Sequence, residues 1–150
     1  MNDPLENVQR RVFGELRDVY SETTVEHVLR PRNAGSLPNP DGFASLNSAC
    51  GEGMEIWLKV RDNRIEEVSF WTDGCAATIA CGSMAGELAK GKTIPQALTV
   101  SARQIADALG NLPEGNFHCA QLASDTLKAA VRDCLALQRE PWKKAYRNRQ

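Results

Sequence analysis

The chain has 150 residues, 42% of them hydrophobic and 25% charged, with a formal net charge of −1. This composition is typical of one ordinary folded domain and excludes a largely disordered chain. The near-neutral charge argues against non-specific nucleic-acid binding, which requires a basic surface. No apolar run approaches the roughly 20 residues of a membrane span, and the first residues show no signal peptide. We therefore expect a cytoplasmic protein with no nucleic-acid or membrane partner.

The first part of the chain is predicted to be helical. Apolar residues recur there at three- and four-residue steps, the pattern of an amphipathic helix: Leu5, Val8, Val12, Leu16 and Val19. A break is expected near Tyr20, where Ser21 would cap a second helix that runs to Leu29. Pro31 ends this pattern, and three of the seven prolines lie within residues 31–42, which predicts a loop.

Strands are predicted next, followed by helices. Hydrophobic and polar residues alternate over residues 54–60 and again over 65–72, which indicates an antiparallel hairpin, and residues 43–47 offer a third strand. Beyond Gly74 the pattern is helical. The helices expected there cover residues 76–90, 94–98, 101–109 and about 119–138. A small antiparallel sheet flanked by helices is an α+β fold.

Three of the five cysteines lie at junctions between these elements. Cys50 precedes a strand, Cys75 separates a strand from a helix, and Cys119 begins the last helix beside His118. Disulfides are disfavoured in a cytosolic chain of this size, which leaves metal binding, thiol chemistry or burial. The start of a helix lowers the pKa of a thiol, because its unpaired amides and dipole favour the thiolate.

The other two cysteines lie on apolar helix faces. Cys134 belongs to the apolar stripe of the last predicted helix, so we expect it in the core. Cys81 is also expected in the core, with an auxiliary thiol role as the alternative. His27, in the middle of a helix, is expected to be structural or at the surface.

Five residues together form a possible set of metal ligands: Cys50, Glu52, Cys75, His118 and Cys119. Three thiols, a carboxylate and an imidazole suit either zinc or an iron–sulfur cluster. No C-x-x-C pair occurs, so zinc-finger spacing is absent, as is the H-x-E and P-C-x-x-C signature of zinc deaminases. A zinc site, structural or sulfur-accepting, and an iron–sulfur site both stay open on spacing alone.

Several short segments between residues 20 and 138 are informative in combination. They read YSE at 20–22, RPRNAGSL at 30–37, ACGE at 49–52, DGCAATIA at 73–80, LAKGKT at 88–93, LP at 112–113, HC at 118–119 and LKAA at 127–130. Together they resemble the IscU/NifU N-terminal family of iron–sulfur cluster assembly scaffolds. The resemblance implies a three-stranded antiparallel sheet with helices packed on one side. We divide the chain into a helical extension (1–19), the scaffold domain (20–140) and a basic, solvated C-terminal tail (141–150).

The resemblance also implies a function. A protein of this family assembles a labile 2Fe–2S cluster from iron and from sulfur delivered by a cysteine desulfurase. It then transfers the cluster to apo iron–sulfur proteins, acting as a carrier rather than as an enzyme. An Hsp70-type chaperone is a further partner in the family, but its docking segment, here Leu112–Asn116, lacks the usual second proline and lysine.

Site residues are implied position by position. Cys50, Cys75 and Cys119 take the three cysteine positions of the family, Glu52 takes its aspartate position, and His118 matches its metal-binding histidine. Cys119 corresponds to the persulfide acceptor. Sulfur acceptance needs an exposed, partly ionised thiol, and we expect Cys119 to meet this need at its helix start. A harder ligand, Glu52 or His118, would loosen the cluster for release. Which of the two it is stays open.

Overall fold

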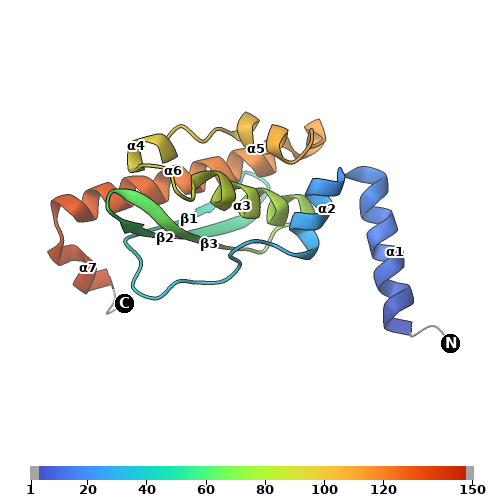
Figure 1. The fold of residues 1–150 in the computed structure, drawn as a ribbon, viewed down its shortest axis with the longest axis horizontal. Coiled ribbons are helices and arrows are strands. Elements are labelled where there is room, and N and C mark those ends of the chain that lie inside the picture. Colours follow the sequence, from blue (N-terminus) through green and yellow to red (C-terminus); the bar gives the residue numbers. More distant parts are fainter. Residues whose placement is uncertain (1–3, 148–150) are drawn as a thin grey trace.

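The computed structural model describes residues 4–147, without the side chains of residues 6, 9, 10, 12, 13 and 147. The elements in chain order (Figure 1) are α1 (Pro4–Val19), α2 (Glu22–Leu29), β1 (Gly42–Asn47), β2 (Gly53–Arg61), β3 (Arg64–Thr72), α3 (Ala76–Ala89), α4 (Ile94–Ala97), α5 (Ala102–Ala108), the short 3₁₀ helix η1 (Glu114–Asn116), α6 (Phe117–Arg139) and α7 (Trp142–Arg147). The strands form one antiparallel sheet in the order β1-β2-β3. The predicted α+β fold is confirmed.

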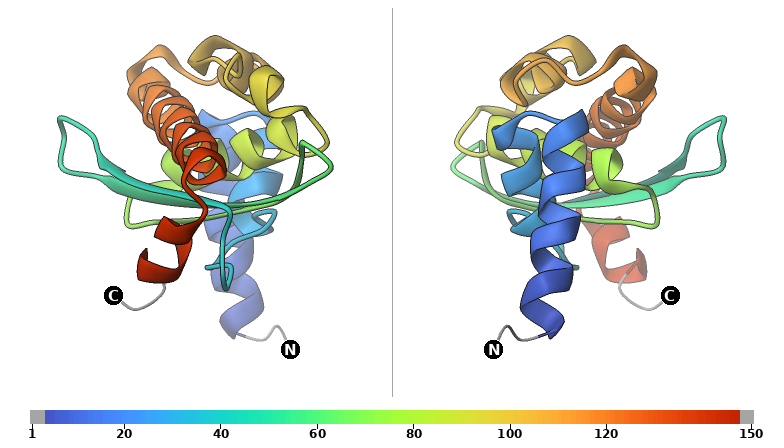
Figure 2. Two further views of the ribbon diagram at one scale, coloured as in Figure 1. Left: turned by 90° about the vertical axis from the view of Figure 1, so that its left-hand side faces the viewer. Right: turned by 90° about the vertical axis from the view of Figure 1, so that its right-hand side faces the viewer.

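The two faces of the sheet differ as the alternating pattern predicts. Met54, Ile56 and Leu58 of β2 are fully buried, whereas the residues between them are only partly covered. Figure 2 shows α3, α4, α5 and α6 on one face of the sheet, while the loop between α2 and β1 passes on the other side. The buried alternation of β2 thus faces the helices, as expected for a sheet covered on one side.

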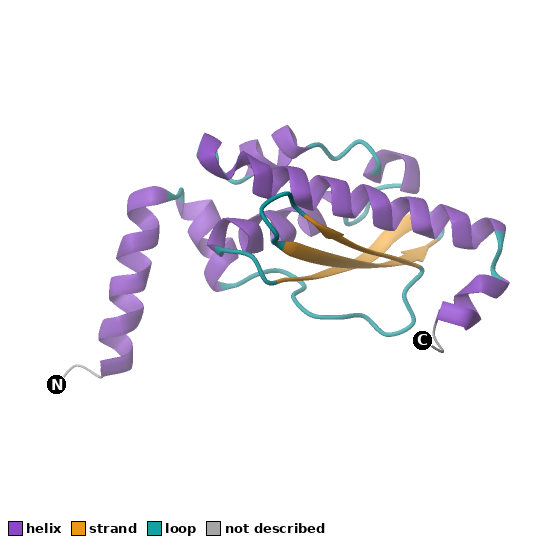
Figure 3. Ribbon diagram, turned by 180° about the vertical axis from the view of Figure 1, so that it is seen from behind, coloured by secondary structure: helices purple, strands orange, loops and turns teal. Residues whose placement is uncertain are grey.

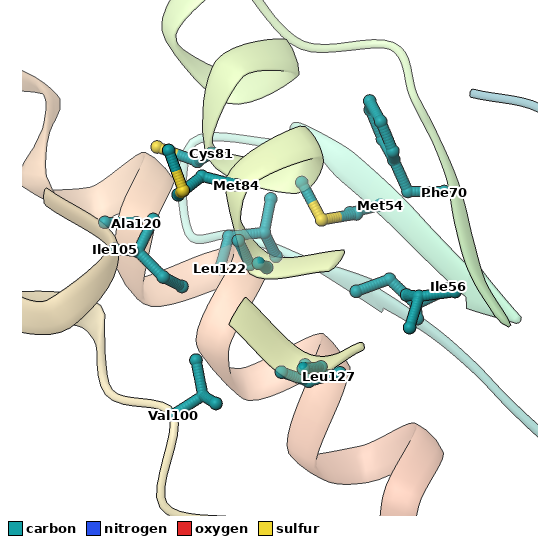
Figure 4. Close-up of a cluster of buried hydrophobic side chains, with 14 of the residues drawn as sticks. Met54, Ile56, Phe70, Cys81, Met84, Val100, Ile105, Ala120, Leu122 and Leu127 are labelled. Carbon is teal, nitrogen blue, oxygen red and sulfur yellow. The ribbon is translucent and has the colours of Figure 1, made fainter. Parts of the chain in front are cut away.

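Helix α6 supplies the largest part of the helical layer. Its predicted apolar stripe is buried throughout: Ala123, Leu127, Ala130, Cys134 and Leu137. Figure 4 shows Leu122 and Leu127 of this helix in one cluster with Met54 and Ile56 of β2. The core positions predicted for Cys81 and Cys134 are confirmed, because their exposed fractions are 0% and 1%.

Both ends of the chain form helices whose described side chains are mostly exposed. Helix α1 is present but projects from the body of the molecule (Figures 1 and 3), and Leu5, Val8 and Val19 of its apolar stripe are exposed. Val12, of the same stripe, lies outside the described side chains. The tail expected to be merely solvated contains α7, and Lys144 Nζ lies 2.7 Å from Asp41 Oδ1. This ion pair, distant in sequence, holds α7 against the start of β1.

Two predicted features of α2 are confirmed. The Ser21 hydroxyl caps the helix by accepting a hydrogen bond from the Thr24 backbone N–H, and it also donates to the Leu109 carbonyl. His27 is buried, with Nδ1 2.7 Å from Ser83 Oγ, and the same hydroxyl accepts the Arg32 backbone N–H at 2.8 Å. His27 therefore has a structural role in joining α2, α3 and the following loop.

Stability is expected to fall in mild acid because of His27. Burial and the nearby Arg32 charge lower the pKa of this imidazole, against the opposing effect of Glu26 and Glu87. A folded-state pKa below the unfolded value means that the unfolded chain binds the proton first. The stabilising contribution is complete above the unfolded pKa of about 6.5 and is lost as pH falls through the folded pKa.

The measurement is the urea midpoint at about pH 7 and about pH 5.5, a window in which histidine titrates and most carboxylates do not. We expect the midpoint of the unmodified protein to fall between these two conditions. The fall should be smaller in His27→Gln, which keeps a polar side chain without a titrating ring. An equal fall in both proteins would contradict the assignment to His27.

Candidate metal centre

Three segments meet at the candidate site. Glu52 lies in the β1–β2 loop, Cys75 is the N-cap of α3, and His118 and Cys119 lie in the first turn of α6. The antiparallel hairpin and the packing of α3 and α6 on one face of the sheet bring these segments to the same end of the domain. Residues far apart in sequence thereby become neighbours.

Glu52, His118 and Cys119 form the tightest group. One ligand atom from each of them lies within 4.8 Å of the others. His118 Nε2 is 3.5 Å from Cys119 Sγ and 4.0 Å from Glu52 Oε2. Because α6 begins at Phe117, two residues before the predicted start, His118 and Cys119 share its first turn and face one point. A carboxylate, an imidazole and a thiol at these separations suit a borderline metal ion such as zinc or ferrous iron.

Cys75 adjoins this group through Thr78. The Thr78 hydroxyl oxygen lies 3.5 Å from Cys75 Sγ, 3.3 Å from Cys119 Sγ and 3.0 Å from Glu52 Oε2. Both thiols therefore border the same buried hydroxyl, one from the start of α3 and one from the start of α6. The structure thus brings together four of the five residues in the predicted ligand set.

Cys50 is the fifth residue and lies apart. It is exposed in the β1–β2 loop and does not belong to the cluster of ligand atoms found among the described residues. The loop is closed by a hydrogen bond from Ser48 N–H to the Glu52 carbonyl at 2.7 Å, and Gly51 takes a φ of +89°. Glu52 is thus directed toward the site while Cys50, two residues earlier, faces solvent.

The two thiols of the site have opposite properties. Cys119 is fully buried, and burial raises the pKa of its thiol to about 11. Cys75 is exposed. Its partial burial raises the pKa of the thiol, but the Thr78 hydroxyl and the backbone N–H groups of Thr78 and Ala77 outweigh this effect, and the pKa is lowered overall. The expectation that Cys119 is the exposed, partly ionised thiol is wrong, because α6 begins two residues before Cys119, which lies fully buried in its first turn.

Two residues near the thiols were not predicted as part of the site. Thr78 lies three residues after Cys75, a spacing that places both on one side of a helix and could have revealed it. Tyr20 is half-buried, and burial together with the neighbouring Cys75 and Cys119 thiols raises the pKa of its phenol. Tyr20 carries no comparable local signal, because its place beside the thiols depends on how α2 packs on α3.

The fold of the domain occurs in solved structures. One of them is the N-terminal part of a NifU-like protein from Brucella abortus, with 22% sequence identity and a TM-score of 0.61 over 81% of this chain and 97% of that chain. At this level of identity the likeness concerns the fold. It shows that the chain shares the α+β fold of that domain.

Sequence comparison is more specific. A family model described as the NifU-like N terminal domain matches residues 19–140. The iron-sulfur cluster assembly scaffold protein IscU 1 of Archaeoglobus fulgidus is 47% identical over 116 residues, 77% of this chain and 76% of that protein. IscU of Azotobacter vinelandii is 42% identical over 119 residues, 76% of this chain and 92% of the relative. The chain therefore belongs to the NifU-like N-terminal domain family, as the resemblance indicated.

The described residues 4–147 contain no helix with the length and apolar character that a bilayer crossing requires.

Proposed function

We propose that this protein is a scaffold on which an iron–sulfur cluster is assembled, and from which the cluster passes to apo-proteins. The observation that carries the proposal is the convergence of Cys75, Cys119, Glu52 and His118 from three separate segments. The names of relatives, iron-sulfur cluster assembly scaffold proteins, support it. The protein would act as a carrier, with the chemistry of sulfur release left to a cysteine desulfurase.

The donor set favours a labile 2Fe–2S cluster over a permanent one. Four thiolates make a durable electron-transfer centre, whereas a carboxylate or imidazole in place of one thiolate binds iron less tightly. Cys75 and Cys119 would hold the cluster together with Glu52 or His118. Cys50 would join them if the β1–β2 loop moved, because it is exposed and only two residues from Glu52.

Sulfur would arrive by thiol exchange. A scaffold thiolate attacks the outer sulfur of the persulfide on the desulfurase, the S–S bond breaks, and the cysteine of the enzyme leaves as a thiolate. Cys119 is the acceptor implied by the family, but it requires an opening of the site because it is buried here. Cys75 is exposed, has a lowered pKa, and is the thiol an incoming persulfide meets first.

Chaperone docking stays a prediction. Leu112 of the corresponding segment is buried and its N–H donates to the Ala106 carbonyl, while Glu114–Asn116 forms the turn that leads into α6. The segment therefore adjoins the first turn that carries His118 and Cys119. A partner bound to this segment would lie next to His118 and Cys119, and its binding would be able to displace these ligands.

Anaerobic reconstitution tests the scaffold proposal. The purified chain is incubated with ferrous iron, cysteine, a cysteine desulfurase and a thiol reductant, then desalted and mixed with an apo-ferredoxin. We expect visible absorption typical of a 2Fe–2S cluster that moves to the ferredoxin. A colourless, zinc-containing product that neither takes up nor donates sulfur would contradict the proposal and favour a zinc protein using the same ligands.

A further inference from the structure

Thr78 occupies the centre of the candidate site although a threonine is not itself a ligand for iron. Its side chain is completely buried in the first turn of α3. The hydroxyl oxygen contacts the Glu52 carboxylate at 3.0 Å, Cys119 Sγ at 3.3 Å and Cys75 Sγ at 3.5 Å. One hydroxyl thus contacts one group from each of the three converging segments.

This hydroxyl has one proton to share among three neighbouring polar atoms, and the Glu52 carboxylate is the nearest of them. A hydroxyl has one proton to donate and two lone pairs to accept with. The carboxylate of Glu52 only accepts, so it takes the proton, and donation to a charged acceptor is the stronger kind of hydrogen bond. Cys119 Sγ is a second acceptor within reach of the same proton, at 3.3 Å, and either atom can donate in the contact with Cys75 Sγ at 3.5 Å. Glu52 is therefore held at a defined place between them.

The surrounding chain is shaped to keep Thr78 there. A Cβ added at Gly74 would lie 2.7 Å from both Cβ and Oγ1 of Thr78, so a glycine is needed for the threonine to fit. Threonine is β-branched and has few side-chain rotamers in a helix, which limits the motion of the hydroxyl. His118 lacks such an anchor, since 42% of its side chain is exposed and its polar contacts found among the described residues are those with Cys119 and Glu52.

We propose that Thr78 is a positioning residue that fixes the Glu52 carboxylate beside the two thiols, and that it thereby makes Glu52, rather than His118, the non-sulfur ligand. The inference rests on the proposed metal-binding function of the same site. It concerns how the ligand is chosen, because a carboxylate already in place binds an arriving ion without further ordering.

Cobalt(II) alone is the probe, so the test does not depend on cluster assembly. Thr78→Val keeps the shape of the side chain and removes the hydroxyl, whereas Thr78→Ser retains it. We expect Thr78→Val to weaken cobalt binding by about 10- to 100-fold, the range observed for groups that orient metal ligands. Thr78→Ser should restore most of the affinity. Thr126→Val is the matched control, because Thr126 is equally buried but bonds to the Leu122 carbonyl of its own helix.

The cobalt spectrum identifies the ligand. With Thr78 present, Glu52→Ala should change the visible bands while His118→Ala leaves them unchanged. In a protein that also carries Thr78→Val, we expect the opposite: His118→Ala should change the visible bands and Glu52→Ala should leave them unchanged. Equal affinity and spectra for Thr78→Val and the unmodified protein would overturn the proposal, as would a spectrum sensitive to His118→Ala but not to Glu52→Ala.

Two further results keep the test decisive. If Thr78→Val fails to fold, Gly74→Ala displaces the hydroxyl without removing it, and cobalt binding as tight as in the unmodified protein would then count against Thr78. If the unmodified protein binds no cobalt, the proposed metal site itself is wrong. A protein that binds cobalt whatever residue is at position 78 would refute only the role of Thr78.

Discussion

Replacing Cys119 with alanine is expected to lower the affinity for cobalt(II) or zinc by more than about 100-fold, the upper end of the effect of losing a group that merely orients a ligand. Among the described residues, Cys119 is the one thiol that belongs both to the tight group with Glu52 and His118 and to the set of contacts around Thr78. Its removal takes away the sulfur at the centre of the site. A competition titration with a coloured chelator measures the loss, and the sulfur-to-cobalt absorption reports on the remaining thiolates.

Cys134→Ala is the matched control. Cys134 is buried in the same helix as Cys119 but packs on the sheet, away from the other ligands. The Cys134→Ala variant should bind cobalt(II) with the affinity of the unmodified protein. Cys50→Ala should also have little effect on the binding of a single metal ion, because Cys50 lies outside the group of ligand atoms. The same variant should shorten the lifetime of an assembled iron–sulfur cluster if the β1–β2 loop closes over it. Cobalt binding that survives Cys119→Ala but not Cys134→Ala would refute the site.

Adding one methyl group at Gly82 is expected to destabilise the fold. A Cβ there would lie 2.6 Å from the ring of Phe70, which β3 places against α3 in the core. Overpacking of this kind typically costs about 1–3 kcal/mol, because the ring or the helix must shift. Helix α3 also carries Cys75 and Thr78 in its first turn. A shift of α3 should therefore weaken cobalt binding as well as lower the urea midpoint.

Gly86→Ala separates packing from helix propensity. Gly86 lies one turn further along α3 and its added Cβ would lie 3.4 Å from the Val68 side chain, an ordinary contact. Alanine is favoured over glycine inside a helix by up to about 1 kcal/mol, so this variant should be as stable as the unmodified protein or more stable. If Gly82→Ala proves as stable as Gly86→Ala in urea, then Phe70 does not restrict the approach of α3.

The sequence predicted most of the residues that form the candidate site, but not how these residues are placed relative to one another. Cysteines at element junctions, a neighbouring histidine and the ACGE segment are local features, and they identified four residues that the structure places together. Cys50 has the same junction character and yet lies apart, because a tight turn directs Glu52 inward. The chemical difference between Cys75 and Cys119 also needed the structure, since burial depends on what packs over each thiol.

Several features were predicted correctly from local patterns of residues. The period of the apolar residues predicted the strands, the buried stripe of α6 and the core positions of Cys81 and Cys134, because periodicity reports which face of an element is covered. Ser21 was recognised as a cap from chemistry within one helical turn. These features involve residues close in sequence, so no knowledge of the packing was required.

The contacts between distant segments could not be predicted from any local pattern. The contact of Thr78 with Glu52 spans 26 residues and its contact with Cys119 spans 41. The ion pair of Lys144 with Asp41 and the buried hydrogen bond of His27 with Ser83 likewise join residues far apart in the chain. Each depends on how α3, α6 and the loops settle on the sheet. That packing is set by side-chain shape across the whole core, which no local pattern records.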